Sequence, residues 1–154
     1  SLNLTTIRGG TKVNIIPDTC ELMLDRRLLP GETQASAQAE ITTLLNKLRA
    51  QDREFEADLT ITTYCPPGEI PAEHPLVQAL GAAAEKILGT PPRLKGFEAT
   101  CEASLLMTAG IPTVVFGPGR IAQAHNADEY VEVQQLVTAQ DIYAALARTL
   151  LAPE

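Results

Sequence analysis

Alternating apolar and polar positions predict three strands in the first part of the chain. Residues 2–8, 12–29 and 56–64 follow the period of two that is typical of half-buried strands, and Pro17-Asp18 interrupts the second stretch. In the second stretch, one face carries four apolar residues: Cys20, Leu22, Leu24 and Leu28. We expect this face to meet a hydrophobic core, and the opposite face, which includes Arg27, to meet a ligand or a partner.

A helix is predicted between the second and third strands. From Thr33 to Ala50, apolar residues recur at helical spacing. Lys47 and Arg49 lie near its end, where the helix dipole favours positive charge. The order strand, strand, helix, strand indicates a small antiparallel sheet with one face covered by a helix.

The strongest boundary signal is the segment Cys65-Pro66-Pro67-Gly68. Two prolines followed by a glycine neither continue a central strand nor fit the interior of a helix. We therefore divide the chain into two domains, residues 1–66 and residues 67–154.

Beyond this boundary the pattern predicts helices and strands in alternation. Helices are expected from Pro75 to Leu88, from Glu102 to Thr108, and from Thr138 onward, where Thr138-x-x-Asp141 has the form of a capping box. Leu94–Phe97 and the continuous apolar run Ile111–Phe116 are expected to be strands. Helices and strands in this order are typical of an α/β fold.

Composition excludes several classes of function. The formal net charge is −7 and no basic run occurs, which argues against nucleic acid as a partner. No apolar stretch approaches the length of a membrane span. Three widely spaced cysteines fit neither a disulfide scaffold nor a cysteine zinc site, so we expect a reducing, cytoplasmic location.

The chain begins abruptly. Ser1 to Ile7 already have the pattern of a strand, with neither a starting methionine nor a leader before them. We therefore expect the chain to be a piece of a longer protein.

A glycine loop and a histidine are the first candidates for chemistry. Gly117-Pro118-Gly119 follows the predicted strand 111–116, and ligands of open α/β sheets bind beyond such strand ends. Its glycines allow the backbone to approach a ligand and to offer N–H groups. His125 could ligate a metal, act as a base or bind substrate. Taken alone, a single loop histidine is more often an ordinary surface residue.

Three further residues have a structural and a functional interpretation. Glu102 could stabilise a helix N-terminus or act beside a cleft. Asn14 could simply be a residue that favours a turn. Arg27 could form a surface ion pair with Asp25.

Four segments in series resemble one family of enzymes. They are residues 9–18, which contain Gly-Gly and Asn-Ile-Ile-Pro-Asp, residues 24–32, residues 109–119 and residues 123–131. Together they resemble the di-zinc amidohydrolases, the family of acetylornithine deacetylase and succinyl-diaminopimelate desuccinylase. The resemblance covers almost the whole chain. The first two segments form one motif and the last two form another, and two multi-residue motifs in order are far more specific than either alone.

The resemblance implies roles for these residues. His125 matches a ligand of one of two zinc ions, for which cobalt can substitute. Asn14 and Arg27 match lid residues that bind the substrate carboxylate, Arg27 through a bidentate charged contact. Gly117 and Gly119 match the loop that approaches the substrate backbone. The substrate is implied to be an N-acyl amino acid, hydrolysed by a metal-activated water.

The resemblance also implies an architecture. Residues 1–66 would be an incomplete lid, which forms homodimers in the family, and residues 67–154 the C-terminal part of the zinc catalytic domain. The other metal ligands and the general base of the family lie in an N-terminal half that this sequence does not contain. We therefore expect no catalytic residue here and no hydrolysis by the isolated chain.

Thr100-Cys101-Glu102-Ala103 bears on the substrate. Its Glu-Ala resembles the acetylornithine deacetylase form, which serves arginine biosynthesis, although the two preceding residues are swapped. Glu102 is then a candidate for contact with a cationic ornithine amine. A desuccinylase, a dipeptidase of the same family and a non-catalytic dimerisation or ligand-binding module remain alternatives.

Overall fold

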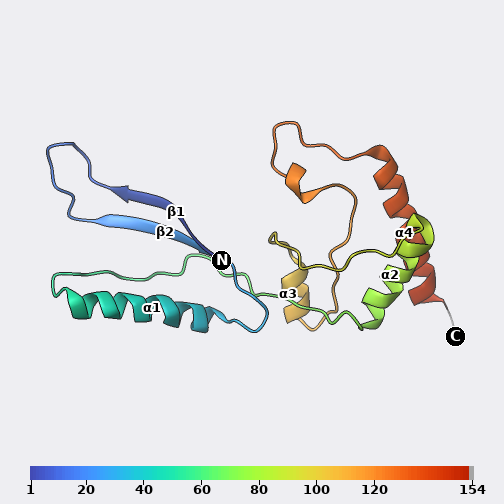
Figure 1. Ribbon diagram of the computed structural model, residues 1–154, viewed down its shortest axis with the longest axis horizontal. Helices are drawn as coiled ribbons and strands as arrows, with labels where there is room; N and C mark the ends of the chain where they lie inside the picture. The colour runs from blue at the N-terminus through green and yellow to red at the C-terminus, as the bar shows by residue number, and fades with distance from the viewer. Residues whose placement is uncertain (153–154) are drawn as a thin grey trace. The chain divides into compact units, whose positions relative to one another are not determined.

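The computed structural model describes residues 1–152 and divides the chain into two compact units, Ser1–Pro67 and Gly68–Glu154. Its described part combines one two-stranded antiparallel sheet with four α-helices (Figure 1). No helix within residues 1–152 is both long and apolar enough to cross a membrane.

The sheet is a hairpin of β1 (Leu2–Gly9) and β2 (Cys20–Arg26). Its register pairs Leu2 with Arg26 and Gly9 with Cys20, and an irregularity between Leu4 and Thr6 leaves Thr5 as an extra residue in β1. Such a bulge bends a strand and increases its twist.

Helix α1 (Gln34–Gln51) follows the hairpin, close to the predicted bounds. Thr33 caps it, because its hydroxyl accepts the Ser36 amide hydrogen while the Ser36 hydroxyl accepts that of Thr33. Arg26 at the end of β2 donates hydrogen bonds to Glu32 and to Glu40 on α1, which ties the helix to the hairpin.

Three expectations for the first unit are wrong. The strand expected over residues 12–29 forms only from Cys20 to Arg26, and residues 10–19 make the loop that joins β1 and β2. Residues 56–64 form no strand, although the segment runs back beside α1, and the Arg49 guanidinium donates to the Ala57 carbonyl (Figure 1). The apolar face of β2 meets no core, since Leu22 and Leu24 are 54% and 44% exposed. A hairpin without a third strand has too little surface to bury a face of its own.

The second unit has its core between two helices, α2 (Pro75–Leu88) and α4 (Val133–Leu151). Helix α2 begins and ends as predicted, with Pro75 at its first position and Gly89 as a left-handed C-cap at φ 73°. Four buried residues form the centre of the core: Leu80, Ala83, Ala84 and Ile142.

Helix α4 begins at Val133, five residues before the predicted start. Thr138 is therefore inside the helix rather than at its cap, and its hydroxyl donates to the carbonyl of Gln134, one turn earlier. Threonine makes both kinds of bond, so the capping-box spacing alone misplaced the boundary.

The remaining elements are α3 (Ala103–Thr108) and a 3₁₀ turn, η1 (Ile121–Gln123). The strands expected at Leu94–Phe97 and Ile111–Phe116 do not form within the described residues. A strand is defined by pairing with a neighbour, and neither segment has a partner strand in the part that the structure describes. The fold is thus mixed α/β, with its only sheet within residues 1–152 in the first unit.

Candidate functional site

The loop Gly117-Pro118-Gly119 starts where the core of the second unit ends. Val114 and Phe116, just before it, pack against the cluster around Ile142. The segment that leads into the loop is therefore held by apolar burial, while both glycines are exposed. An exposed loop that follows a firmly packed segment is a suitable arrangement for contact with a ligand.

Helix α4 holds this loop with two side chains. The Gln135 Oε1 atom accepts a hydrogen bond from the Gly119 amide at 2.8 Å, and the Tyr143 hydroxyl donates one to the Phe116 carbonyl at 2.7 Å. Gly119 has φ of 93°, a left-handed conformation that a side chain would strain. One of the two glycine amides that could serve a ligand is therefore already occupied.

His125 is an exposed residue in a left-handed conformation, with φ of 65°. Among the described residues it is the one non-glycine with positive φ. The carboxylate of Glu129 accepts its backbone amide hydrogen at 2.9 Å. Within residues 1–152 its imidazole makes no hydrogen bond, so the side chain is available to a ligand.

The described residues do not assemble a metal site by themselves. Residues 1–152 contain no group of three or more His, Cys, Asp or Glu side chains placed to hold a metal ion. Zinc in proteins takes three or four such ligands, so the donors present here do not fit a complete zinc site. His125 can supply at most one of the ligands of such a site.

Glu102 lies at the N-cap position of α3, but its carboxylate makes no capping hydrogen bond. Within the described residues the carboxylate has no other partner, and the residue is exposed. A hydrogen-bonded capping role is thus not what the carboxylate performs here. Its proposed contact with a substrate amine stays a prediction.

Asn14 and Arg27 belong to the first unit, whereas Glu102, Gly117, Gly119 and His125 belong to the second. Asn14 is an exposed residue of the hairpin loop. Arg27 follows β2, and its Nε donates to the Asp25 carboxylate at 3.0 Å, with half of the Arg27 side chain exposed. The ion pair expected from the sequence therefore forms, and the substrate-binding role stays a prediction.

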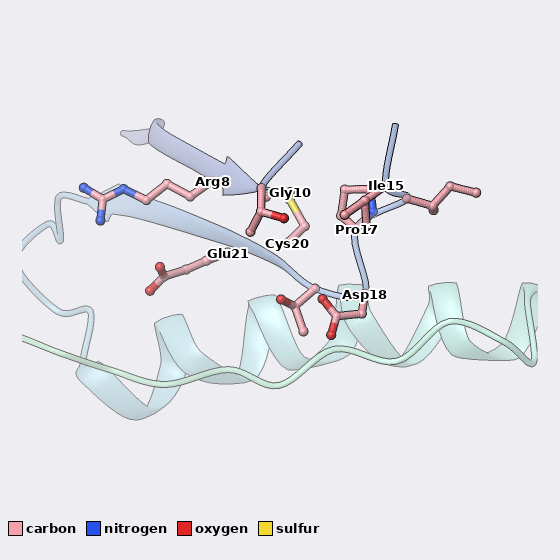
Figure 2. Close-up of a pocket in the computed structure, with 11 residues that line it drawn as sticks. Arg8, Gly10, Ile15, Pro17, Asp18, Cys20 and Glu21 are labelled. Atoms are coloured by element: carbon pink, nitrogen blue, oxygen red, sulfur yellow. The ribbon is translucent and has the colours of Figure 1, made fainter. Parts of the chain in front are cut away.

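A cavity of about 650 Å³ lies at the end of the hairpin (Figure 2). Arg8 and Glu21 come from the paired strands, while Ile15, Pro17 and Asp18 come from the loop that joins them. Asn14 is not among the lining residues. The cavity is open and mixed in polarity, so it does not define a ligand by itself.

Reasoning from sequence did not single out Gln135, Tyr143 or Glu129. Each acts on the loop region from a distance of 4 to 27 residues along the chain. Gln135 lies before Thr138, the predicted start of the last helix, and Tyr143, one position after the core residue Ile142, looked like an ordinary helix position. No local pattern marks such contacts, and only the correct start of α4 would have drawn attention to Gln135.

Comparison with known proteins matches both units. The family described as Peptidase family M20/M25/M40 matches residues 5–149. The acetylornithine deacetylases of Salmonella arizonae, Salmonella paratyphi B and Salmonella newport are each 38% identical to the chain over 138 residues. These alignments cover 87% of the chain and 33% of each relative, so the chain spans about a third of the length of these curated relatives.

Proposed function

Because the chain belongs to the peptidase family M20/M25/M40, we propose that it is part of a zinc-dependent amidohydrolase that removes the acyl group from an N-acyl amino acid. The observation that carries this proposal is the length of the family match, which runs through both units from residue 5 to residue 149. In this proposal the first unit is the lid and the second is the C-terminal part of the catalytic domain.

The proposed roles follow the residues that the structure leaves exposed. Arg27 and Asn14 bind the substrate carboxylate, and Gly117 approaches the substrate backbone. His125 supplies one metal ligand, which agrees with an imidazole that is exposed and makes no hydrogen bond within residues 1–152. The first unit also forms the contact between two copies of the enzyme.

A bound zinc ion in such hydrolases supplies Lewis acidity and an activated water. The donors within residues 1–152 do not complete a zinc site, so the remaining ligands and the general base are proposed to lie in a part of the enzyme that precedes these residues. The isolated chain is accordingly proposed to be inactive.

For the substrate we propose N-acetylornithine. The 38% identity to enzymes named acetylornithine deacetylase supports this choice. Glu102 is proposed to face the cationic side chain of ornithine, and its carboxylate, which has no partner within residues 1–152, is consistent with that role.

The test of the activity compares two proteins: the 154-residue chain and the complete translation product of its gene. We expect the complete product to hydrolyse N-acetylornithine, to lose activity with a chelator and to regain it with zinc. We expect no turnover by the chain alone. Turnover by the chain alone would contradict the missing-ligand argument. A complete product that binds N-acetylornithine without hydrolysing it would favour a non-catalytic binding module.

The test of the substrate uses Glu102→Gln in the complete product. Loss of the carboxylate should raise KM for N-acetylornithine and leave hydrolysis of N-acetyl-leucine unchanged, because the latter has no side-chain amine. Succinyl-diaminopimelate and a dipeptide serve as competing substrates. Unchanged kinetics with N-acetylornithine would remove Glu102 from the site, and faster turnover of a competitor would redirect the assignment to a desuccinylase or a dipeptidase.

A further inference from the structure

Two side chains on one face of α4 determine the conformation of the loop between Phe116 and Gly119. Gln135 and Tyr143 lie about two turns apart, so both project toward the loop. One accepts the Gly119 amide hydrogen at 2.8 Å, and the other donates to the Phe116 carbonyl at 2.7 Å. The loop is thereby held at both of its ends by the same helix.

The hydrogen bond between Gln135 and the Gly119 amide does not cap the start of α4. Gln135 is the third residue of α4, a position from which glutamine commonly reaches back to the amide of the N-cap residue. Here Glu132 is the N-cap and has no side-chain capping bond, while the Gln135 carbonyl oxygen is directed to the loop. The start of α4 thus lacks a side-chain cap, while the loop gains the hydrogen bond from the Gly119 amide to Gln135, which we call the anchor.

The bond of Tyr143 fixes the other end. Its ring meets the Phe116 ring edge to face, with centroids 5.6 Å apart and an interplanar angle of 87°. The hydroxyl also lies within 3.7 Å of the place where a side chain at Gly117 would begin. Tyr143 therefore bounds the space beside Gly117 as well as holding the residue before it.

We propose that Gln135 and Tyr143 are positioning residues for substrate binding. They hold the loop so that the Gly119 amide is occupied and the Gly117 amide, which makes no hydrogen bond within residues 1–152, is the one that contacts an oxygen of the N-acyl amino acid. This proposal rests on the proposed function. It assigns affinity for substrate to two residues that do not touch the reacting atoms.

The first experiment measures hydrogen exchange of the Gly119 amide by NMR in the 154-residue chain. Gln135→Leu removes the acceptor and should speed exchange about tenfold, the factor expected from one net hydrogen bond. Gln135→Glu keeps an acceptor oxygen and should restore slow exchange. Gln134→Leu, on the neighbouring exposed residue, is the control and should have no effect.

The second experiment measures kinetics with N-acetylornithine in the complete translation product. Gln135→Leu and Tyr143→Phe should each raise KM about fivefold with little change in kcat, because the loop then spends less time in the conformation that binds. Gln135→Glu should rescue KM, which a merely structural defect would not show. Tyr130→Phe, a change to an exposed tyrosine, is the matched control.

The outcomes separate the two proposals. Fast Gly119 exchange in the unchanged chain overturns the anchor, and a KM that Gln135→Leu leaves unaltered overturns its role in substrate binding. Slow exchange that Gln135→Glu restores, together with a rescued KM, supports it. If the complete product has no hydrolase activity, the proposed function fails, whereas the exchange rates alone decide whether the anchor exists.

Discussion

Tyr143 contacts Phe116 twice: its hydroxyl donates to the Phe116 carbonyl at 2.7 Å, and the two rings pack edge to face. The tyrosine stays 45% exposed, so the pair lies at the margin of the core rather than within it. A polar contact and an aromatic contact on one partner restrict both the backbone and the ring of Phe116. This margin is where the core of the second unit gives way to the candidate loop.

Separating the two contacts gives the first prediction. Tyr143→Phe removes only the hydrogen bond and should lower the free energy of unfolding by about 1 kcal/mol. Tyr143→Ala also removes the ring contact and should cost roughly 1 kcal/mol more. Urea denaturation followed by circular dichroism measures both. Equal stabilities of Tyr143→Phe and the unchanged chain would mean that the hydroxyl bond contributes nothing net.

The second prediction concerns the centre of the core. Ile142 is 1% exposed between α2 and α4, so Ile142→Ala should lower the free energy of unfolding by roughly 2–5 kcal/mol through lost burial and a cavity. Leu150 is on the same helix but 49% exposed, and Leu150→Ala should cost less than about 1 kcal/mol. Similar losses at the two positions would contradict the assignment of the core.

Thr6 and Thr5 give a third, paired prediction. The Thr6 hydroxyl is buried and has no hydrogen-bond partner within the described residues, whereas the Thr5 hydroxyl donates to the Met23 carbonyl at 3.1 Å. Thr6→Val replaces an unsatisfied group by a methyl of similar shape and should stabilise the chain by about 1 kcal/mol. Thr5→Val loses a bond and should destabilise it by about 0.5 kcal/mol. Thermal unfolding of the two variants should therefore shift in opposite directions.

Glu32 provides a prediction on pH. Its carboxylate accepts the Leu29 amide hydrogen at 2.7 Å and pairs with Arg26 at 2.8 Å, and these contacts lower its pKa below the ordinary value of 4.5. A carboxylate whose pKa is lower in the folded state stabilises the fold above the unfolded pKa and loses that contribution as the pH falls through the folded value. The stability difference between the unchanged chain and Glu32→Gln should thus be constant above pH 4.5 and shrink below it.

The control for this experiment is Glu56→Gln, an exposed carboxylate without a hydrogen bond or ion pair within residues 1–152. Its stability should stay parallel to that of the unchanged chain across the same range. A Glu32→Gln difference that persists at low pH would show that side-chain shape, and not charge, carries the contribution.

Local signals predicted the helices of this chain well. The helix expected from Thr33 begins at Gln34, with Thr33 as its N-cap, and the helix expected from Pro75 to Leu88 has those bounds in the structure. The predicted start of α4 was wrong because Glu132, the true N-cap, provides no side-chain cap, whereas Thr138 inside the helix has the spacing of a capping box.

Strands were less predictable because they depend on partners. Ile111–Phe116 has the apolar run of a buried strand, and Val114 and Phe116 do pack on the core, but no neighbouring strand pairs with the run within residues 1–152. Alternation at residues 56–64 likewise produced an extended segment without a ladder. Side-chain pattern reports which face is apolar and does not report whether a backbone partner is present.

The candidate site divides in the same way. Gly117, Gly119 and His125 follow from sequence motifs, and their roles stay predictions. The residues that hold them, Gln135 and Tyr143, bond across 16 and 27 positions of the chain. Such contacts depend on how helix and loop pack, which no local motif encodes.

The backbone of His125 has a practical consequence for mutagenesis. With φ at 65°, His125 is in a region that histidine and asparagine adopt several-fold more often than other residues with a Cβ, so His125→Ala adds a backbone cost of up to about 1 kcal/mol to the loss of the imidazole. A conventional alanine scan would therefore confuse a displaced loop with a missing ligand. Asparagine tolerates the left-handed region, so His125→Asn removes the imidazole and keeps the path of the chain. That substitution, and not alanine, isolates what the ring itself contributes.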